Sequence, residues 1–166
     1  PPSVNFEVKI VITGSHGMLG RDLSRVLGVH HTIFIIKHND FCVDTKRTLE
    51  SFILKISPNI LIHCGAYTDV NEAESKNSLS ELESSNLHLV SILCDLCKKY
   101  NISLIYPQTF LTLRDKKEVH AESSRDYKPL GNYALSKLAA ERVIREKLSE
   151  DQFMIIRLGG FYGGGE

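Results

Sequence analysis

The sequence predicts an α/β fold, a doubly wound parallel sheet of about six strands with helices on both faces. Short apolar runs alternate with longer segments of helical periodicity along the 166 residues. Several runs, such as TIFII at 32–36, are continuously apolar or β-branched, which is typical of strands covered on both faces. A glycine-rich turn follows the first run. Strand–helix alternation implies right-handed crossovers, and these produce an open parallel sheet.

The first half of the chain alternates twice between strand and helix. Residues 6–14 (FEVKIVITG) form the first strand, and residues 17–28 form a helix with its apolar residues on one face. Residues 32–37 (TIFIIK) form the second strand, and residues 41–43 (FCV) would be a short third one. A helix over 45–56 follows, and a proline closes it.

The second half continues the pattern. Residues 59–65 (NILIHCG) form a strand, and residues 82–100 form a long helix. Another strand at 102–107 (ISLIYP) precedes a polar loop and a helix around Tyr133, and FMIIRL at 153–158 is the last strand. Ligands of such sheets bind at the carboxyl ends of the strands, so the loops there are the places to search for a site.

Composition excludes several classes of protein. The 20 basic and 20 acidic residues balance, and no basic run indicates binding to nucleic acid or to a membrane surface. The apolar runs are far shorter than the roughly 20 residues that a membrane-spanning helix needs. Residues 1–7 are predicted to be a flexible tail without a signal-peptide pattern, and residues 8–166 a single domain.

The four cysteines do not indicate a metal centre. Cys94 and Cys97 form a C-x-x-C in the middle of a helical pattern, without a second Cys or His pair at zinc spacing. Two small residues on a helix face are the favoured interpretation, and a redox or metal site is the alternative. The seven histidines form no H-x-x-x-H cluster, so no metal site is predicted. A reduced, cytoplasmic setting is expected.

The glycine-rich turn TGSHGMLG predicts binding of a dinucleotide. Gly14 allows the sharp turn, Gly17 lets the backbone approach a pyrophosphate, and Gly20 lets the helix pack close to the sheet. The anion would meet free N–H groups at the helix N-terminus, where the macrodipole favours negative charge. Between a strand and a helix, the turn predicts a Rossmann-type domain. A turn needed only for packing is the alternative.

The end of the second strand indicates which dinucleotide binds. An acidic residue there would bind the ribose 2′-hydroxyl of NAD, whereas a basic residue suits the 2′-phosphate of NADP. Lys37 and His38 occupy this position, and Asp40 follows slightly later. The sequence therefore predicts NADP, with NAD as the alternative.

A tyrosine and a lysine lie one helical turn apart in GNYALSKLAAE. Tyr133 and Lys137 share a helix face, and a nearby ammonium lowers the pKa of a tyrosine from its usual value of about 10. Tyr133 is therefore the predicted proton donor to a carbonyl oxygen, and Lys137 would also bind the nicotinamide ribose. Thr109, at the end of the fifth predicted strand, offers a hydroxyl to the same oxygen. A surface pair is the alternative.

Four blocks follow one another in an order found in a known family. They are VITGSHGMLGRDL, PNILIHCGAYTDVNEAES, YKPLGNYALSKLAAE and IIRLGGFYGGG. They resemble the cofactor-binding part of the dTDP-4-dehydrorhamnose reductase family, in the extended branch of the short-chain dehydrogenases/reductases. Asn86 stands where that family has a structural asparagine.

The resemblance implies an oxidoreductase of dTDP-rhamnose biosynthesis that reduces a 4-keto nucleotide sugar with NADPH or NADH. Its catalytic residues would be Thr109, Tyr133 and Lys137. Matching positions place Gly17, Met18 and Leu19 at the pyrophosphate, Cys42 and Val43 near the adenine, and Gly65, Ala66 and Tyr67 near the nicotinamide-side ribose. The remaining predicted cofactor contacts are Gly14, His16, Lys37, His38, Tyr133 and Lys137.

The chain departs from the family at the wall beside the reacting sugar. Where the family reads close to Ser-Thr-Asp-Tyr-Val-Phe, this chain reads PQTFLTL, with Phe110 in the acidic position and Leu111 in the aromatic one. Cys42 also replaces a common aspartate. Enzymes of this family bind the sugar nucleotide mainly through a second lobe downstream of the last predicted strand. A fragment of a longer enzyme, inactive alone, is therefore expected, and loss of that lobe is the alternative.

Two other functions stay open. A non-catalytic, dinucleotide-binding regulatory subunit of the same fold would suit the altered PQTFLTL segment. A nucleotide-sugar epimerase or dehydratase is the other, although Gln108 and Phe110 replace the acidic residues that dehydratases usually have beside the threonine. A nucleotide sugar is the expected partner, and a homodimer is an open alternative to a monomer.

Overall fold

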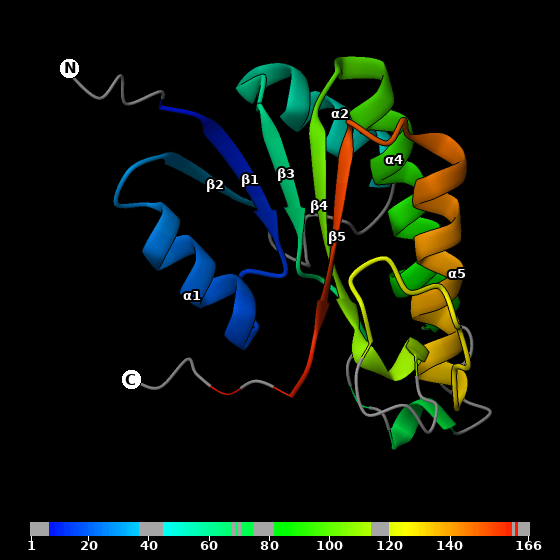
Figure 1. Cartoon of the computed structure of the whole chain (residues 1–166). Helices are drawn as coiled ribbons and strands as arrows, with labels where there is room; N and C mark the ends of the chain where they lie inside the picture. Colours follow the sequence, from blue (N-terminus) through cyan, green and yellow to red (C-terminus); the bar gives the residue numbers. More distant parts are fainter. Residues whose placement is uncertain are drawn as a thin grey trace.

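Five parallel strands form one sheet in the order β2-β1-β3-β4-β5 (Figure 1). The computed structural model describes residues 7–36, 45–67, 69, 71–74, 82–113, 120–160 and 162. Within them the strands are β1 (Lys9–Thr13), β2 (Thr32–Ile36), β3 (Ile60–His63), β4 (Ser103–Thr109) and β5 (Phe153–Leu158). The predicted doubly wound α/β fold is confirmed. The short strand predicted at 41–43 lies outside the described residues.

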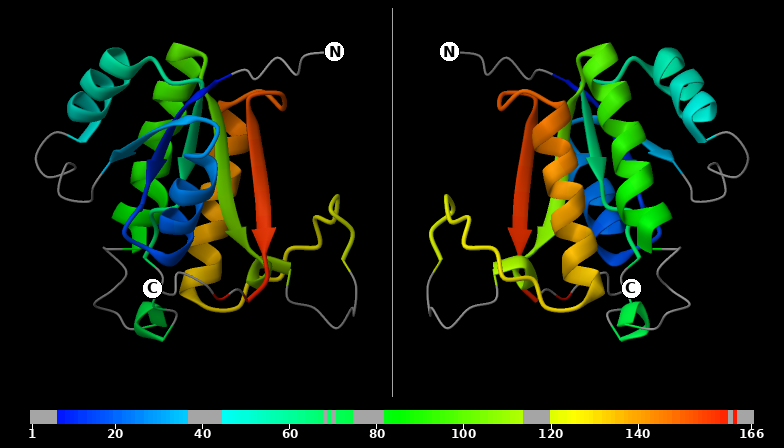
Figure 2. Two further views of the ribbon diagram at one scale, coloured as in Figure 1. Left: turned by 90° about the vertical axis from the view of Figure 1, so that its left-hand side faces the viewer. Right: turned by 90° about the vertical axis from the view of Figure 1, so that its right-hand side faces the viewer.

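Helices cover the two faces of the sheet unequally. The α-helices of the described part are α1 (Met18–Leu27), α2 (Thr45–Ile56), α4 (Leu89–Tyr100) and α5 (Asn132–Lys147). Three short turns, η2 (Glu72–Glu74), η4 (Glu83–His88) and η5 (Phe110–Leu113), lie between them and the strands. Helix α1 lies on one face, and α2, α4 and α5 lie on the other (Figure 2).

The continuous apolar strands supply both layers of the core. Side chains alternate between the faces of a strand. Val11 and Leu61 therefore pack against α2, α4 and α5, while Ile10, Ile12 and Ile62 pack on the side of α1. All five are nearly inaccessible to solvent. Burial on both faces is the physical reason that these strands lack a polar alternation.

The helix predicted over residues 82–100 changes from π-helical to α-helical geometry along its length. Its first part, η4, is a π-helical turn, and the regular helix α4 begins at Leu89. Cys94 and Cys97 on α4 are unbridged and fully buried in the core, and burial raises the pKa of each thiol to about 12. They therefore have the packing role that the sequence predicts.

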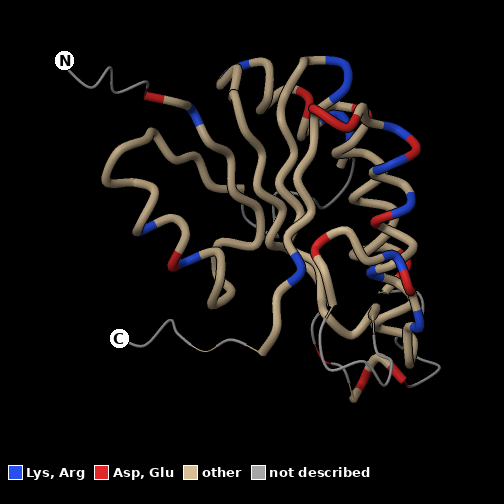
Figure 3. The backbone as a smooth tube through the Cα atoms, viewed as in Figure 1, with Lys and Arg blue, Asp and Glu red and all other residues tan. Residues whose placement is uncertain are grey.

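The described helices leave part of the α1 face of the sheet uncovered. Met154 and Ile156 of β5 point to that face and are 58% and 40% exposed. Their partners on β4, Ile105 and Pro107, are only partly buried. Charges of both signs are interspersed along α5, and the strands carry few of them (Figure 3). In the described part of the chain, no helix combines the length and apolarity needed to span a bilayer.

Candidate functional site

Two adjoining cavities lie at the carboxyl ends of the central strands. The larger has a volume of about 560 Å³ and the smaller about 330 Å³. Both are lined by Gly14 after β1 and by His63 and Ala66 at and after β3. The chain leaves β1 for β2 on one side and returns to β3 on the other, so this is the switch point where such sheets bind ligands.

The glycines of the turn differ in how much room surrounds them. Gly14 has a φ of +69°, and a Cβ there would lie 2.4 Å from the Gly65 nitrogen. A Cβ on Gly20 would lie 2.4 Å from the Gly14 carbonyl oxygen. At Gly17 the nearest atom to an added Cβ is 3.4 Å away, which is an ordinary contact, and Gly17 lines the smaller cavity. The turn is therefore compact towards the sheet and accessible towards the smaller cavity, as a dinucleotide requires.

The N-terminus of α1 opens into this space. Gly17 is its N-cap and provides no side-chain cap, and the first-turn N–H groups of a helix have no intrahelical acceptor. Met18 and Leu19 of this turn line the smaller cavity. The free N–H groups and the helix dipole make this end of α1 suitable for a pyrophosphate.

The structure gathers most of the predicted site residues around the two cavities. The larger cavity is lined by Gly14, His16, Gly65, Ala66 and Tyr67. The smaller one is lined by Gly14, Gly17, Met18, Leu19, Ala66, Thr109, Tyr133 and Lys137. Lys37, His38, Cys42 and Val43 lie outside the described residues. The three predicted catalytic residues therefore share one cavity although they come from β4 and α5.

Lys137 is a buried cation. Its side chain is 4% exposed, and its Nζ donates a hydrogen bond of 2.9 Å to the Pro107 carbonyl oxygen. The same Nζ lies 4.1 Å from the centre of the Tyr106 ring. Burial lowers the pKa of Lys137 to about 7, because a buried ammonium loses its hydration. Lys137 is therefore close to titrating at neutral pH.

The prediction that Lys137 lowers the pKa of Tyr133 is wrong. Partial burial raises the pKa of the Tyr133 phenol, and removal from water is the dominant cause. The Lys137 ammonium is directed at Pro107 and Tyr106 on β4 instead. Helical spacing brings two residues to one face of the helix, but it does not determine which groups the charged end of a long side chain contacts.

Asn86 connects the loop after β3 to helix α5. It is 1% exposed, and its Oδ1 accepts a hydrogen bond of 2.8 Å from the Tyr67 N–H. Its Nδ2 donates to Ser136 Oγ at 3.0 Å, and Ser136 Oγ donates to the Tyr133 carbonyl oxygen at 2.8 Å. The π-helical turn η4 carries this asparagine, in keeping with the frequent occurrence of such turns at functional sites. Asn86 thus has the structural role that the resemblance implies.

A carboxylate holds the N-terminus of α5. Glu74 Oε1 accepts a hydrogen bond of 2.7 Å from the Asn132 N–H, and Asn132 Nδ2 donates to the Ala73 carbonyl oxygen at 3.2 Å. Negative charge is favourable at a helix N-terminus. The contact fixes the first turn of α5, which carries Tyr133.

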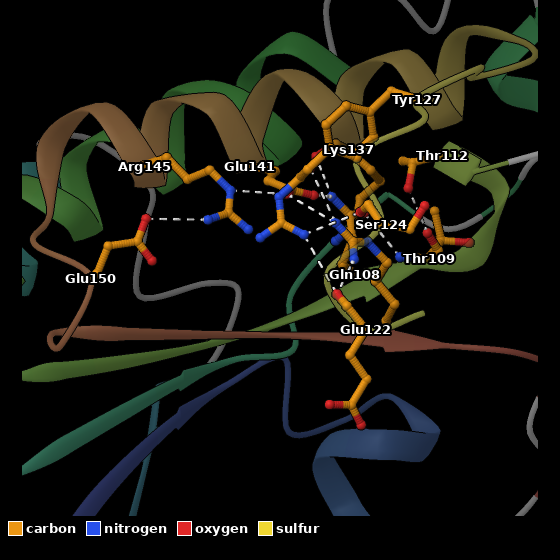
Figure 4. A network of polar contacts seen from close by, with 12 residues as sticks. Gln108, Thr109, Thr112, Glu122, Ser124, Tyr127, Lys137, Glu141, Arg145 and Glu150 are labelled. Atoms are coloured by element: carbon orange, nitrogen blue, oxygen red, sulfur yellow. Dashed lines mark hydrogen bonds and ion pairs between the residues drawn. The ribbon is translucent and has the colours of Figure 1, made fainter. Parts of the chain in front are cut away.

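A second carboxylate, Glu141, is buried one turn after Lys137. Its Oε1 accepts hydrogen bonds from the Tyr127 hydroxyl, from Arg145 Nε at 3.0 Å and from Arg157 at 3.2 Å (Figure 4). Burial alone would raise the pKa of Glu141, but these hydrogen bonds and cations hold it below its usual value. Glu141 therefore remains ionised and joins α5 to β5 and to the loop before α5.

Sequence reasoning missed His63, which lines both cavities. It shares a hydrogen bond of 2.6 Å with the Thr13 hydroxyl through Nδ1, and its Nε2 has no hydrogen-bond partner among the described residues. Burial, and then the Lys137 charge, lower the pKa of His63 to about 3, so the ring is neutral. Its position at the end of a predicted strand was the available signal.

Three polar residues of the larger cavity gave no signal in the sequence. Ser84, Ser85 and His88 of η4 line the larger cavity, but in the sequence they are polar residues at the start of a long helix. Gln108 lines the smaller cavity beside Thr109. Within the described ranges, no group of three or more His, Cys, Asp or Glu side chains is arranged to hold a metal ion.

Comparison with known proteins finds a matching family model and several similar reductases. A family model described as the RmlD substrate binding domain matches residues 8–166. A dTDP-4-keto-6-deoxy-D-glucose reductase from Streptomyces niveus is 26% identical over 155 residues, which are 92% of this chain and 52% of that protein. A dTDP-4-dehydrorhamnose reductase from Aggregatibacter actinomycetemcomitans is 26% identical over 138 residues, 82% of this chain and 46% of that protein. The chain spans about half the length of these relatives.

Solved structures share the fold. The dTDP-4-dehydrorhamnose reductase from Bacillus anthracis, solved in complex with NADP, matches with a TM-score of 0.82 at 22% identity, over 93% of this chain and 54% of that one. The Yersinia enterocolitica dTDP-4-dehydrorhamnose reductase matches with a TM-score of 0.81 at 25% identity, over 96% of this chain and 55% of that one. Because the family model extends from residue 8 to residue 166, the chain belongs to the RmlD substrate binding domain family, which confirms its resemblance to dTDP-4-dehydrorhamnose reductases.

Proposed function

We propose that this chain is the NADP-binding part of an enzyme that reduces a 4-keto nucleotide sugar, and that it carries the catalytic residues. One observation carries the proposal: Thr109, Tyr133 and Lys137 line a single cavity into which the N-terminus of α1 opens. The named activities of the relatives from Streptomyces niveus and Aggregatibacter actinomycetemcomitans support it. The NADP bound by the Bacillus anthracis reductase favours that cofactor, with NAD as the alternative.

The cavities suggest how the cofactor is held. First-turn N–H groups at Met18 and Leu19 would bind the pyrophosphate beside Gly17. The larger cavity would take the adenosine end, so Gly65 and Tyr67, which line it, would contact that end and not the nicotinamide-side ribose that the resemblance implies. Tyr133 and Lys137 would hold the nicotinamide-side ribose in the smaller cavity. When bound, the cofactor supplies the hydride that reduces the carbonyl carbon.

Tyr133 would supply the proton to the carbonyl oxygen. Its raised pKa keeps the phenol protonated at neutral pH, so the donor is present whenever substrate binds. Thr109 Oγ1 accepts a hydrogen bond of 3.3 Å from the Leu111 N–H, which leaves its own hydroxyl hydrogen to donate to the same carbonyl oxygen. These two donors would stabilise the negative charge that develops as the hydride arrives.

Binding of the reduced cofactor tests the proposal directly. The chain is expected to enhance NADPH fluorescence saturably, with weaker enhancement of NADH, because a Rossmann-type site binds the dinucleotide before any sugar. Displacement of NADPH by NADP in the same cuvette checks that the site is specific. Absence of saturable binding of both reduced cofactors would refute the proposed function.

Tyr133→Phe is expected to separate catalysis from cofactor binding. In the enzyme that contains this chain, loss of the phenolic proton should lower kcat with dTDP-4-dehydrorhamnose by about 100-fold or more. The Kd of NADPH should stay within about twofold, because the ring and its burial are retained. Tyr100→Phe is the matched control, since the Tyr100 hydroxyl bonds Glu50 at the far end of α4. An unchanged kcat in Tyr133→Phe would exclude Tyr133 as the proton donor.

A further inference from the structure

Gln108 is a buried amide immediately before the predicted catalytic threonine. It is 2% exposed, and its Oε1 accepts a hydrogen bond of 2.9 Å from the Thr109 N–H. Its Nε2 donates to the Lys137 carbonyl oxygen at 2.8 Å and to Glu141 Oε2 at 3.2 Å. One side chain therefore links the end of β4 to two successive turns of α5 (Figure 4).

The neighbours determine the orientation of this amide. The Thr109 N–H can only donate, so it requires the amide oxygen. The Lys137 carbonyl and the ionised Glu141 carboxylate can only accept, so they require the amide nitrogen. If the amide were rotated by 180°, a donor would face the Thr109 N–H, and an acceptor would face the Lys137 carbonyl and the Glu141 carboxylate. Gln108 is therefore held in a single orientation.

The end of β4 depends on this link because β3 stops short of it. Pairing between β3 and β4 ends at Ile62 and Ile105, whereas pairing between β4 and β5 continues to Thr109 and Leu158. The last residues of β4 therefore have β5 on one side and line the smaller cavity.

The acceptor on α5 is itself buried and hydrogen-bonded. Glu141 is 1% exposed and is held by two arginines, Arg145 on α5 and Arg157 on β5. Its remaining oxygen, Oε2, accepts from Gln108. Both carboxylate oxygens of Glu141 therefore have partners, and such a buried network favours one arrangement of its parts. Arg157 Nε has no hydrogen-bond partner among the described residues.

We propose that Gln108 is a positioning residue, which sets the place of the Thr109 hydroxyl relative to the α5 turn that carries Tyr133 and Lys137. Gln108 contacts Thr109 and Lys137 through their backbones, so both side chains stay available to ligands. The consequence for cofactor binding rests on the proposed function, whereas the alignment itself requires no cofactor.

Gln108→Met tests the proposal, because methionine keeps the length and volume of the side chain and removes the amide. Gln152→Met is the matched control. Gln152 also donates from its amide to two carbonyl oxygens, of Cys97 at 2.8 Å and of Ile102 at 3.4 Å, but at the amino ends of β4 and β5. Hydrogen exchange of the Thr109 amide is followed by NMR, and NADPH affinity is measured by fluorescence. Gln108→Asn, which withdraws the amide by one methylene, serves if the methionine variant does not fold.

Gln108→Met is expected to speed exchange of the Thr109 amide and to weaken NADPH binding, each about tenfold, while Gln152→Met changes neither more than about twofold. Unchanged Thr109 exchange in Gln108→Met would overturn the proposal. Equal loss of NADPH affinity in both variants would also overturn it, because Gln108 would then only stabilise the fold. If the wild-type chain binds neither NADPH nor NADH, the proposed function fails, and the exchange comparison alone decides the role of Gln108.

Discussion

Gly14→Ala is expected to destabilise the domain by about 3–5 kcal/mol and to abolish NADPH binding. Gly14 adopts a φ of +69°, a region that alanine disfavours. A methyl group there would also lie 2.4 Å from the Gly65 nitrogen and 2.6 Å from the Cys64 carbonyl carbon. Both are backbone atoms in the segment directly after β3, so relief of the clash requires this segment to move away from the end of β1.

Gly17→Ala is the matched control for this substitution. The nearest atom to its added methyl would be the Gly14 carbonyl oxygen at 3.4 Å, which is an ordinary contact. The free energy of unfolding should therefore change by no more than about 1 kcal/mol, whereas NADPH binding should weaken about tenfold as the methyl occupies space needed by the pyrophosphate. Urea unfolding and NADPH titration measure the two effects. Wild-type stability in Gly14→Ala would contradict the close packing of the turn on β3.

Lys137→Met is expected to have opposite effects on stability and on cofactor binding. The methionine keeps the apolar stem of the side chain but removes the charge of a residue that is only 4% exposed. Burying a charge without full compensation is unfavourable, so the variant should be more stable than the wild type at pH 6. NADPH binding should weaken about tenfold or more, because a hydrogen bond from a charged donor to the ribose is lost.

The stability advantage of Lys137→Met should disappear as the pH rises. The pKa of Lys137 is about 7 in the folded chain and 10.5 in a model lysine, so between these values the unfolded chain binds a proton that the folded chain does not. Stability of the wild type therefore rises with pH in this window, at up to about 1.4 kcal/mol per pH unit. Above pH 9 the partly buried Cys64 thiol opposes this trend, because its removal from water raises its pKa from 9.0 to about 11.

Urea unfolding of the wild type and of Lys137→Met at pH 6, 7, 8 and 9 measures this difference. The gap between the two free energies of unfolding should shrink by about 2–3 kcal/mol over that range. Lys147→Met controls for NADPH binding, since Lys147 lies on the same helix but pairs with Asp95 away from the cavities. A constant gap across the pH range would mean that Lys137 is not held as a buried, readily deprotonated amine.

Most of the fold could be predicted because the strands are apolar on both faces and the helices are amphipathic. The helix predicted over 45–56 has those bounds in the structure, since Pro58 closes it. Strand β4 extends to Thr109, two residues past its predicted end, because pairing with β5 continues there. Local sequence does not encode this extension, since it depends on a partner more than 40 residues away.

Only the parts of the candidate site that belong to short sequence motifs could be predicted. The glycine turn and the Tyr133–Lys137 pair are local patterns, and both border the smaller cavity. The predicted direction of the Tyr133 pKa shift is wrong, because burial in the folded chain raises this pKa and burial cannot be read from local spacing. The contacts of Gln108 are equally non-local, because they join β4 to a helix about 30 positions later.

The late position of β5 in the sequence limits when this site can assemble as the polypeptide leaves the ribosome. Every predicted catalytic and cofactor residue is translated before β5, which begins at Phe153. Until β5 emerges, the end of β4 lacks its paired neighbour and Glu141 lacks Arg157. Parallel pairing between distant segments is slow, because the entropy cost of closing the intervening chain comes before the contacts form. A nascent chain that ends before residue 153 would therefore contain all of these side chains without the strand that brings them into alignment.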